Sequence, residues 1–125
     1  MTPKPMLSRV IAEREPRVKV HIWVQAQVRL CDMHFIPVVI ARRGDADAGA
    51  VVIRLLRGVQ KSVLVRRGTQ PDGSEGWITV AGGGEIDDAA ADAYVTREVK
   101  RDADVWVIEV DDPKGRYWPD APIRP

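Results

Sequence analysis

Residues 39–53, VIARRGDADAGAVVI, contain two apolar runs on either side of a short charged segment that is closed by Gly44 and Gly49. Apolar, β-branched runs separated by glycine and aspartate are typical of two strands joined by a turn. We therefore interpret this stretch as a β-hairpin around which the rest of the chain is organised. Its charged tip is the most distinctive chemistry in the sequence, although no reaction follows from it.

The segments on either side of this stretch extend the pattern to two helices and six strands. Apolar residues that alternate along the chain predict strands, and apolar residues three and four apart predict helices. The first helix has only a narrow polar stripe, so we expect it to be largely buried. The predicted helices are 17–34 and 87–102, and the predicted strands are 38–43, 50–57, 61–67, 77–81, 105–111 and 116–118.

This element order, α-β-β-β-β-α-β-β, predicts the α+β class. Short links between consecutive strands favour antiparallel pairing, so we expect a mainly antiparallel sheet covered by the two helices. The alternative is a mixed α/β sheet, in which the second helix is a crossover that lays strand 105–111 parallel to strand 77–81. The sequence leaves both arrangements open.

Length and composition indicate one domain. A chain of 125 residues with 45% apolar content fits a single α+β domain, here 17–118. We expect 1–16 to be a loosely held arm and 119–125 an irregular tail. Neither shows a periodic apolar face, so removing residues 1–15 and 120–125 should leave the thermal stability nearly unchanged.

The same composition indicates a compartment. The chain has one cysteine, and its first residues lack the apolar core of an export signal. No apolar run approaches the length of a membrane span. We therefore expect a cytoplasmic protein that does not bind a membrane.

Charge is divided unevenly along the chain. Residues 1–67 carry 13 Lys/Arg against 5 Asp/Glu, whereas residues 68–125 carry 6 against 13. The strand periodicity places the basic residues at strand ends beside apolar residues, not on one all-basic face. We expect these bases to pair with the acidic second half or with the tip carboxylates, which leaves at most weak, non-specific binding of nucleic acid.

The second helix contains one carboxylate on its apolar side. Asp87 is expected to cap this helix, whose inner stripe includes Ala91 and Tyr94. Glu98 falls inside that stripe on the helical wheel, which places its charge against the sheet. A buried charge needs a partner, so we predict an ion pair between Glu98 and an arginine from the strands.

The tip carboxylates resemble the start of a calcium loop, but the pattern is incomplete. Such a loop needs a glutamate at its twelfth position, where this chain has Leu56. We expect Asp45 and Asp47 instead to form Asx-turn hydrogen bonds and to pair with Arg42 or Arg43. These four residues form the candidate interaction tip, and no metal site is predicted.

Two further patterns carry no cofactor prediction. Cys31 and His34 lie one helical turn apart, but too few other ligands are present for zinc. The helix C-terminus also disfavours a thiolate, so Cys31 is expected in the core. The glycines at 82–84 precede a helix start that already carries acidic residues, which argues against a phosphate site. We predict no cofactor and no catalytic residue.

Several stretches of this chain resemble a known family. They are Ile22-Trp23-Val24 with Cys31, the segment RRGDADAGAV at 42–51, Trp77, and RDADVWVIEV at 101–110. Over roughly residues 18–118 the chain is similar to the bacterial family named domain of unknown function 1491. The resemblance implies a small intracellular bacterial protein with no assigned activity.

Three functional classes follow from these patterns. The favoured class is a non-catalytic module that presents the charged tip to a protein partner. The second is a nucleic-acid-binding protein that uses the basic first half, namely Arg42, Arg43, Arg54, Arg57, Lys61, Arg66 and Arg67. The third is a small hydrolase built on Glu98, Glu109 and Asp111, the carboxylates nearest apolar surroundings.

Overall fold

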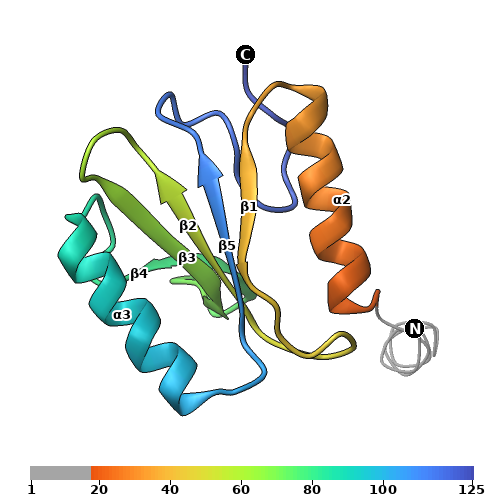
Figure 1. The fold of residues 1–125 in the computed structure, drawn as a ribbon, viewed down its shortest axis with the longest axis vertical. Helices are drawn as coiled ribbons and strands as arrows, with labels where there is room; N and C mark the ends of the chain where they lie inside the picture. Colours follow the sequence, from red (N-terminus) through yellow and green to blue (C-terminus); the bar gives the residue numbers. More distant parts are fainter. Residues whose placement is uncertain (1–17) are drawn as a thin grey trace, which may run out of the picture.

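The computed structural model describes residues 18–125, which form two helices and a five-stranded sheet (Figure 1). Residues 1–16, the predicted arm, lie outside the described residues. Residues 119–125 form no helix or strand. The elements are α2 (Val20–Met33), β1 (Val38–Arg42), β2 (Val51–Leu56), β3 (Ser62–Thr69), β4 (Glu75–Val80), α3 (Asp88–Arg101) and β5 (Trp106–Asp111).

The strands are arranged in the order β1-β5-β2-β3-β4, and every neighbouring pair is antiparallel except β2 and β5. The predicted α+β class and mainly antiparallel sheet are therefore confirmed. The one parallel pair arises because α3 carries the chain from β4 across the sheet. β5 consequently runs in the same direction as β4, as the crossover alternative predicted, but it lies between β1 and β2.

The predicted hairpin at 39–53 is wrong. β1 and β2 form as expected, but they do not pair with each other, because β5 lies between them. The reason is the composition of β5, whose residues Trp106, Val107, Ile108 and Val110 are each no more than 2% exposed. A nearly continuous apolar run is typical of a strand whose two faces are both covered, and β5 has this setting between the two core clusters.

The predicted strand at 116–118 does not form. The side chain of Asp112 instead accepts the backbone N–H groups of Arg116 and Tyr117, each at 2.9 Å, and bends the chain after β5. Tyr117 is 2% exposed, and its hydroxyl donates to Gln27 of α2 at 2.6 Å. The C-terminal segment thus packs as an irregular layer.

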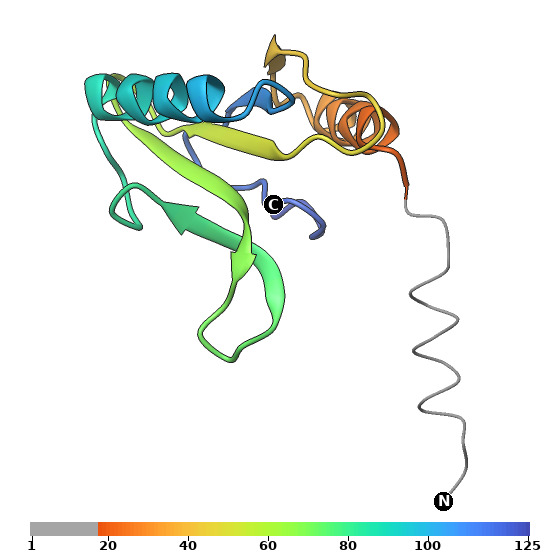
Figure 2. The same cartoon turned by 90° about the horizontal axis from the view of Figure 1, so that it is seen from below.

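The two faces of the sheet have different covers (Figure 2). On one face, α3 packs over Val52 and Leu64 through Ala91 and its neighbours. On the other face, α2 and the C-terminal segment cover a larger cluster that includes Ile53 and Trp106. The expectation that α2 is largely buried is wrong. Only Val24, Gln27 and Cys31 of this helix are buried, because a single side of α2 packs against the core cluster.

Two tryptophans hold the end of the chain. Trp23 of α2 and Trp77 of β4 stack with ring centroids 5.1 Å apart. Their indole N–H groups donate to the two carboxylate oxygens of Asp120, at 2.9 and 2.8 Å. Ile123 also packs against the larger core cluster. These contacts reverse the expectation that residues 120–125 can be removed without effect.

Replacing Asp120 by alanine should leave both indole groups without their acceptor. We expect the free energy of unfolding to fall by about 1 kcal/mol, and the melting temperature by roughly 5 °C. Asp111→Ala is the matched control, because Asp111 is exposed and no hydrogen bond to its carboxylate is found within residues 18–125. Thermal melts that place both variants at the same temperature would contradict the anchoring role.

Candidate functional site

The predicted tip, residues 43–50, is a compact turn. The Asp45 carboxylate accepts the backbone N–H groups of Asp47 at 3.1 Å and Ala48 at 2.8 Å. This is the local hydrogen bonding expected of an aspartate in a turn. The predicted pairing of Asp45 and Asp47 with Arg42 or Arg43 is wrong, since Asp47 lies 3.7 Å from Lys19 instead.

The backbone of the same loop joins three elements. The carbonyl of Ala46 accepts the N–H of His21 in the first turn of α2 at 3.0 Å. The carbonyl of Asp45 accepts the indole N–H of Trp106 at 2.7 Å. A Cβ atom at Gly44 or Gly49 would lie 2.1 or 2.3 Å from the carbonyl oxygen of Asp104. Glycine is therefore required at both positions by close backbone approach.

The two tip arginines are also engaged within the chain. Arg42 Nη1 donates to the carbonyls of Ala103 and Val105, at 3.0 and 2.7 Å. The guanidinium of Arg43 lies over the ring of Trp106, 5.3 Å from its centroid. Arg43, Asp45 and Asp47 are nevertheless exposed. The tip is accessible to a partner, but its distinctive sequence is explained by the packing of the fold.

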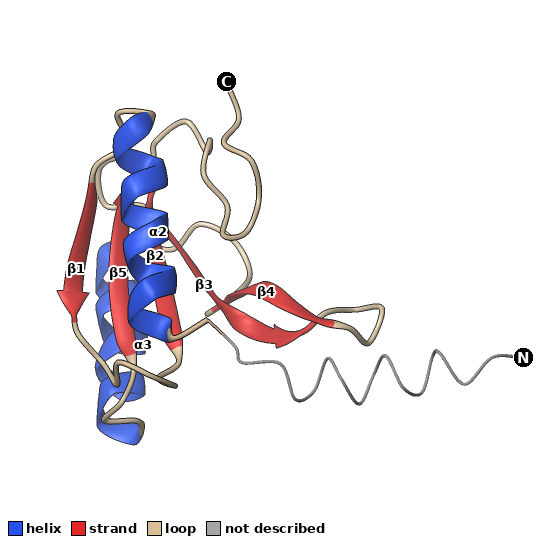
Figure 3. Ribbon diagram, turned by 90° about the vertical axis from the view of Figure 1, so that its right-hand side faces the viewer, coloured by secondary structure: helices blue, strands red, loops and turns tan. Residues whose placement is uncertain are grey.

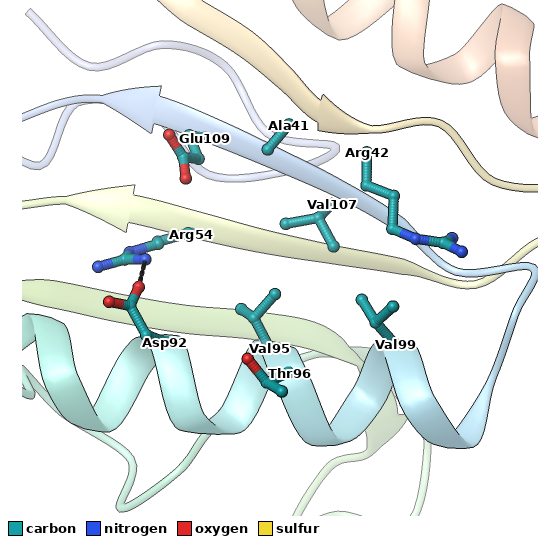
Figure 4. A pocket seen from close by; sticks show the side chains of 9 residues that line it. All are labelled: Ala41, Arg42, Arg54, Asp92, Val95, Thr96, Val99, Val107 and Glu109. Carbon is teal, nitrogen blue, oxygen red and sulfur yellow. Dashed lines mark hydrogen bonds and ion pairs between the residues drawn. The ribbon is translucent and has the colours of Figure 1, made fainter.

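A groove of about 360 Å³ lies beside the tip, between α3 and the strands β5 and β1 (Figure 4). The groove forms because α3 covers β2 and β3 but does not reach across the sheet to β1. Its apolar wall is formed by Ala41, Val95, Val99 and Val107, and its polar side chains are Arg42, Arg54, Asp92, Thr96 and Glu109.

Arg54 lines this groove and makes three side-chain hydrogen bonds. Its Nε donates to Ser62 at 3.0 Å, Nη1 to Asp92 at 2.6 Å and Nη2 to Asp88 at 3.1 Å. Burial lowers the pKa of Arg54, but the hydrogen bond and charge of Asp92 outweigh it, so the pKa lies above its ordinary value. Glu109 differs, because no hydrogen bond or ion pair reaches its carboxylate from residues 18–125.

Glu98 lies on the side of α3 that faces the sheet and is 4% exposed. Its carboxylate pairs with Arg66 of β3, and it accepts Arg101 Nη2 at 2.7 Å. Burial alone would raise the pKa of Glu98, but hydrogen bonds from Arg101 and Tyr94 and the charge of Arg66 hold it below its ordinary value. This charge is the one that the helical wheel places against the sheet.

The three carboxylates considered for hydrolysis do not meet in either hollow on α3. Glu109 lines the groove, whereas Glu98 lines a separate hollow of about 240 Å³. Asp111 is exposed at the end of β5 and lines neither. Cys31 is buried in the core, where burial and then the charges of Asp112 and Asp32 raise its pKa to about 11. A thiol with this pKa is a poor nucleophile near neutral pH.

Within residues 18–125, three arginines of the basic first half pair with carboxylates of the acidic second half, as predicted for the strand bases. The pairs are Arg54 with Asp88 and Asp92, Arg57 with Asp112, and Arg66 with Glu98. Arg67, in turn, lies over the ring of Trp77. Three of the seven basic residues named for nucleic-acid binding are therefore held in ion pairs within the fold.

The groove was not predicted from the sequence. Its walls come from β1, β2, α3 and β5, and no local pattern indicates that these strands share one face. The available signals were the small Ala41 and the single charge in the apolar run of β5 at Glu109. Ala41 and Glu109 indicate a groove only when β5 is known to lie between β1 and β2.

Comparison with known proteins gives the following matches. The family described as protein of unknown function (DUF1491) matches residues 18–118. A crystal structure of a DUF1491 family protein from Caulobacter crescentus CB15 is 30% identical, with a TM-score of 0.72, and covers 86% of this chain and 100% of its own. An NMR structure of a DUF1491 family protein from the same bacterium is 29% identical, with a TM-score of 0.69. It covers 86% of this chain and 97% of its own.

A more distant structure has the same fold. It is the solution structure of protein Atu0922 from A. tumefaciens, with 21% identity, a TM-score of 0.63, and coverage of 76% of this chain and 86% of its own. No curated protein matches the chain. Among residues 18–125, neither helix has the length and apolar content needed to cross a membrane.

Replacing Glu98 by glutamine keeps the size of the side chain but removes its charge. We expect the free energy of unfolding at neutral pH to fall by about 2 kcal/mol, because two arginines lose an ionic partner. The folded pKa of Glu98 is lowered. The contribution of Glu98 to the free energy of unfolding is therefore complete above its pKa in the unfolded chain, about 4.3. It is lost as the pH falls through the lower pKa of the folded protein.

Urea titrations of wild type and Glu98→Gln at neutral pH and at about pH 3 measure this dependence. The difference between the two proteins should shrink at the acid pH. Glu85→Gln is the matched control, since Glu85 is exposed and has no ion pair within residues 18–125. A difference that does not change with pH, or an equal loss in the control, would contradict a stabilising ion pair at Glu98.

Proposed function

The chain belongs to the DUF1491 family, whose description assigns no activity, and we propose that it is a non-catalytic protein-interaction module. The observation that supports this function best is the edge of β1 beside the groove, because among residues 18–125 β1 pairs with no strand other than β5. An exposed strand edge binds an extended segment of a partner through backbone hydrogen bonds, and an adjacent pocket selects its side chains. The module would therefore bind its partner by adding a strand to the sheet.

Backbone groups of β1 point away from the sheet at two positions. The N–H of Asp111 donates to the carbonyl of Pro37 at 2.9 Å, and the register pairs Val39 with Glu109. Hydrogen-bonded and non-hydrogen-bonded pairs alternate along an antiparallel ladder. Positions 37 and 39 therefore bond to β5, whereas Val38 and Ile40 direct their N–H and C=O groups toward the free edge.

This edge is short, and within residues 18–125 no further strand pairs with it. In Figure 3, which faces the right-hand side of Figure 1, β1 lies beside α2 and no other element is drawn in front of it. The register of β1 with β5 shifts between Ile40 and Arg42, which ends the regular part of the strand. Short, irregular edges limit indiscriminate sheet extension. A partner would thus pair with Val38 and Ile40 only, and would need the groove for additional affinity.

The charged tip borders the same surface, because Arg42 both ends β1 and lines the groove. The exposed side chains of Arg43, Asp45 and Asp47 continue from this end of the groove. We assign these four tip residues to the rim of the interface. Rim charges commonly influence the rate and selectivity of association more than its affinity.

A displayed library of random peptides tests this proposal with the full chain as bait. Peptides selected by the wild type should slow hydrogen exchange at the amides of Val38 and Ile40, because these N–H groups gain acceptors. Ala41→Tyr should abolish their binding, since Ala41 is the small residue that leaves the groove open toward β1. Ala93→Tyr, an exposed position of α3 outside the groove, should bind as the wild type does.

Two results would contradict the proposal. One is a selection that returns no peptide above background with a correctly folded wild type. The other is a set of peptides that protects amides elsewhere and binds Ala41→Tyr equally well.

A further inference from the structure

We infer that the strand recognised by this module carries a lysine or arginine that pairs with Glu109 in the groove. This inference rests on the proposed function, because it specifies the side chain of a partner that adds to β1. It follows from three observations, which concern the charge around Glu109, its distance from the free edge and the residues that lie between.

The first observation is an excess of negative charge at this end of the groove. Arg54 faces Asp88 and Asp92, and both carboxylates hydrogen-bond to it. Its Nε donates to the hydroxyl of Ser62. Glu109 lies beside Arg54 in the register of β5 and β2, so this guanidinium lies near three carboxylates and hydrogen-bonds to two of them. An added cation would supply the charge that this arrangement lacks.

The second observation is the position of Glu109 within the sheet. Figure 4 shows its carboxylate on the same side of the sheet as Arg54 and the valines of α3. Val39 of β1 is its cross-strand neighbour toward the free edge. Adjacent strands lie about 4.8 Å apart, so a guest residue opposite Val39 would have its Cα roughly 10 Å from that of Glu109. Only a long side chain spans this separation.

The third observation is the surface that such a side chain would cross. Val39 is 58% exposed, which is unusual for valine on a sheet, and Ala41 beside it is also exposed. The aliphatic stem of a lysine or arginine can cover apolar surface of this kind while its charged end reaches a carboxylate. Val39 thus has an exposed apolar face that a basic guest residue would bury.

The other end of the groove carries the opposite charge. Arg42 lies there, with Nη1 bound to the carbonyls of Ala103 and Val105. Its register partner on β5 is Val107, two residues before Glu109. A guest side chain placed there would be selected for negative charge. The two ends of the groove therefore give opposite outcomes in a selection experiment.

The selection described above decides between these outcomes when it is repeated with variants of Glu109. Peptides chosen by the wild type should share a lysine or arginine at one fixed position. Glu109→Gln should select peptides without that preference, and Glu109→Lys should select aspartate or glutamate there. Glu85→Lys, which introduces the same charge change at an exposed site outside the groove, should retain the basic preference.

A double-mutant cycle measures the contact itself. Replacing the shared basic residue of one selected peptide by methionine should weaken its binding to the wild type about tenfold, and its binding to Glu109→Gln hardly at all. Glutamine keeps the side-chain size, and an unchanged melting temperature would show that the variant is folded.

The failure of this inference is distinct from the failure of the proposed function. Peptides that protect Val38 and Ile40 but show no charge preference, or an acidic one, overturn the pairing with Glu109 and leave strand addition in place. The pairing with Glu109 is also overturned if replacing the basic residue by methionine weakens binding to the wild type and to Glu109→Gln equally. A selection in which no peptide protects β1 overturns both.

Discussion

The close packing of residues 43–50 against the chain at Asp104–Trp106 is the constraint on which the rest of the structure depends. At Gly44 and Gly49 the loop approaches the Asp104 carbonyl so closely that no Cβ fits. The indole of Trp106 donates to the loop, and the loop in turn accepts N–H groups from the first turn of α2. This contact fixes the start of β5 between the end of β1 and the start of β2. The position of β5 then makes β1 an edge strand and leaves the groove beside it.

Electrostatics follow the same arrangement. Arg54 of β2 and Arg66 of β3 pair with acids of α3, and Arg57 after β2 pairs with Asp112 after β5, so part of the uneven charge along the sequence is offset by contacts within the fold. Glu109 has no hydrogen bond or ion pair within residues 18–125, although its charge helps to raise the pKa of Arg54, which pairs with Asp88 and Asp92. The proposed interface therefore rests on a strand edge and on a groove carboxylate that has no ion pair within residues 18–125.

The sequence predicts local elements well and long-range pairing poorly. Asp87 was expected to begin the second helix, and its side chain accepts the N–H of Ala90 as a cap does. The wheel position of Glu98 required a buried partner, and Arg66 lies there. The pairing of β1 with β5 depends on residues far apart in sequence, which periodicity cannot identify. Asp120 was missed for the same reason, because its two indole donors lie on α2 and β4.

The stability of Gly49→Ala tests the central constraint most directly. The glycine has no positive backbone φ, so alanine would be disfavoured by its Cβ alone, which would lie 2.3 Å from the Asp104 carbonyl oxygen. Gly84→Ala is the matched control, since its added Cβ meets no atom within 4 Å and its φ is not positive either. Urea titration should show a loss of about 3 kcal/mol for Gly49→Ala, in the range of overpacked sites, and almost none for Gly84→Ala. Equal stability of the two variants would show that the loop does not hold β5 in place.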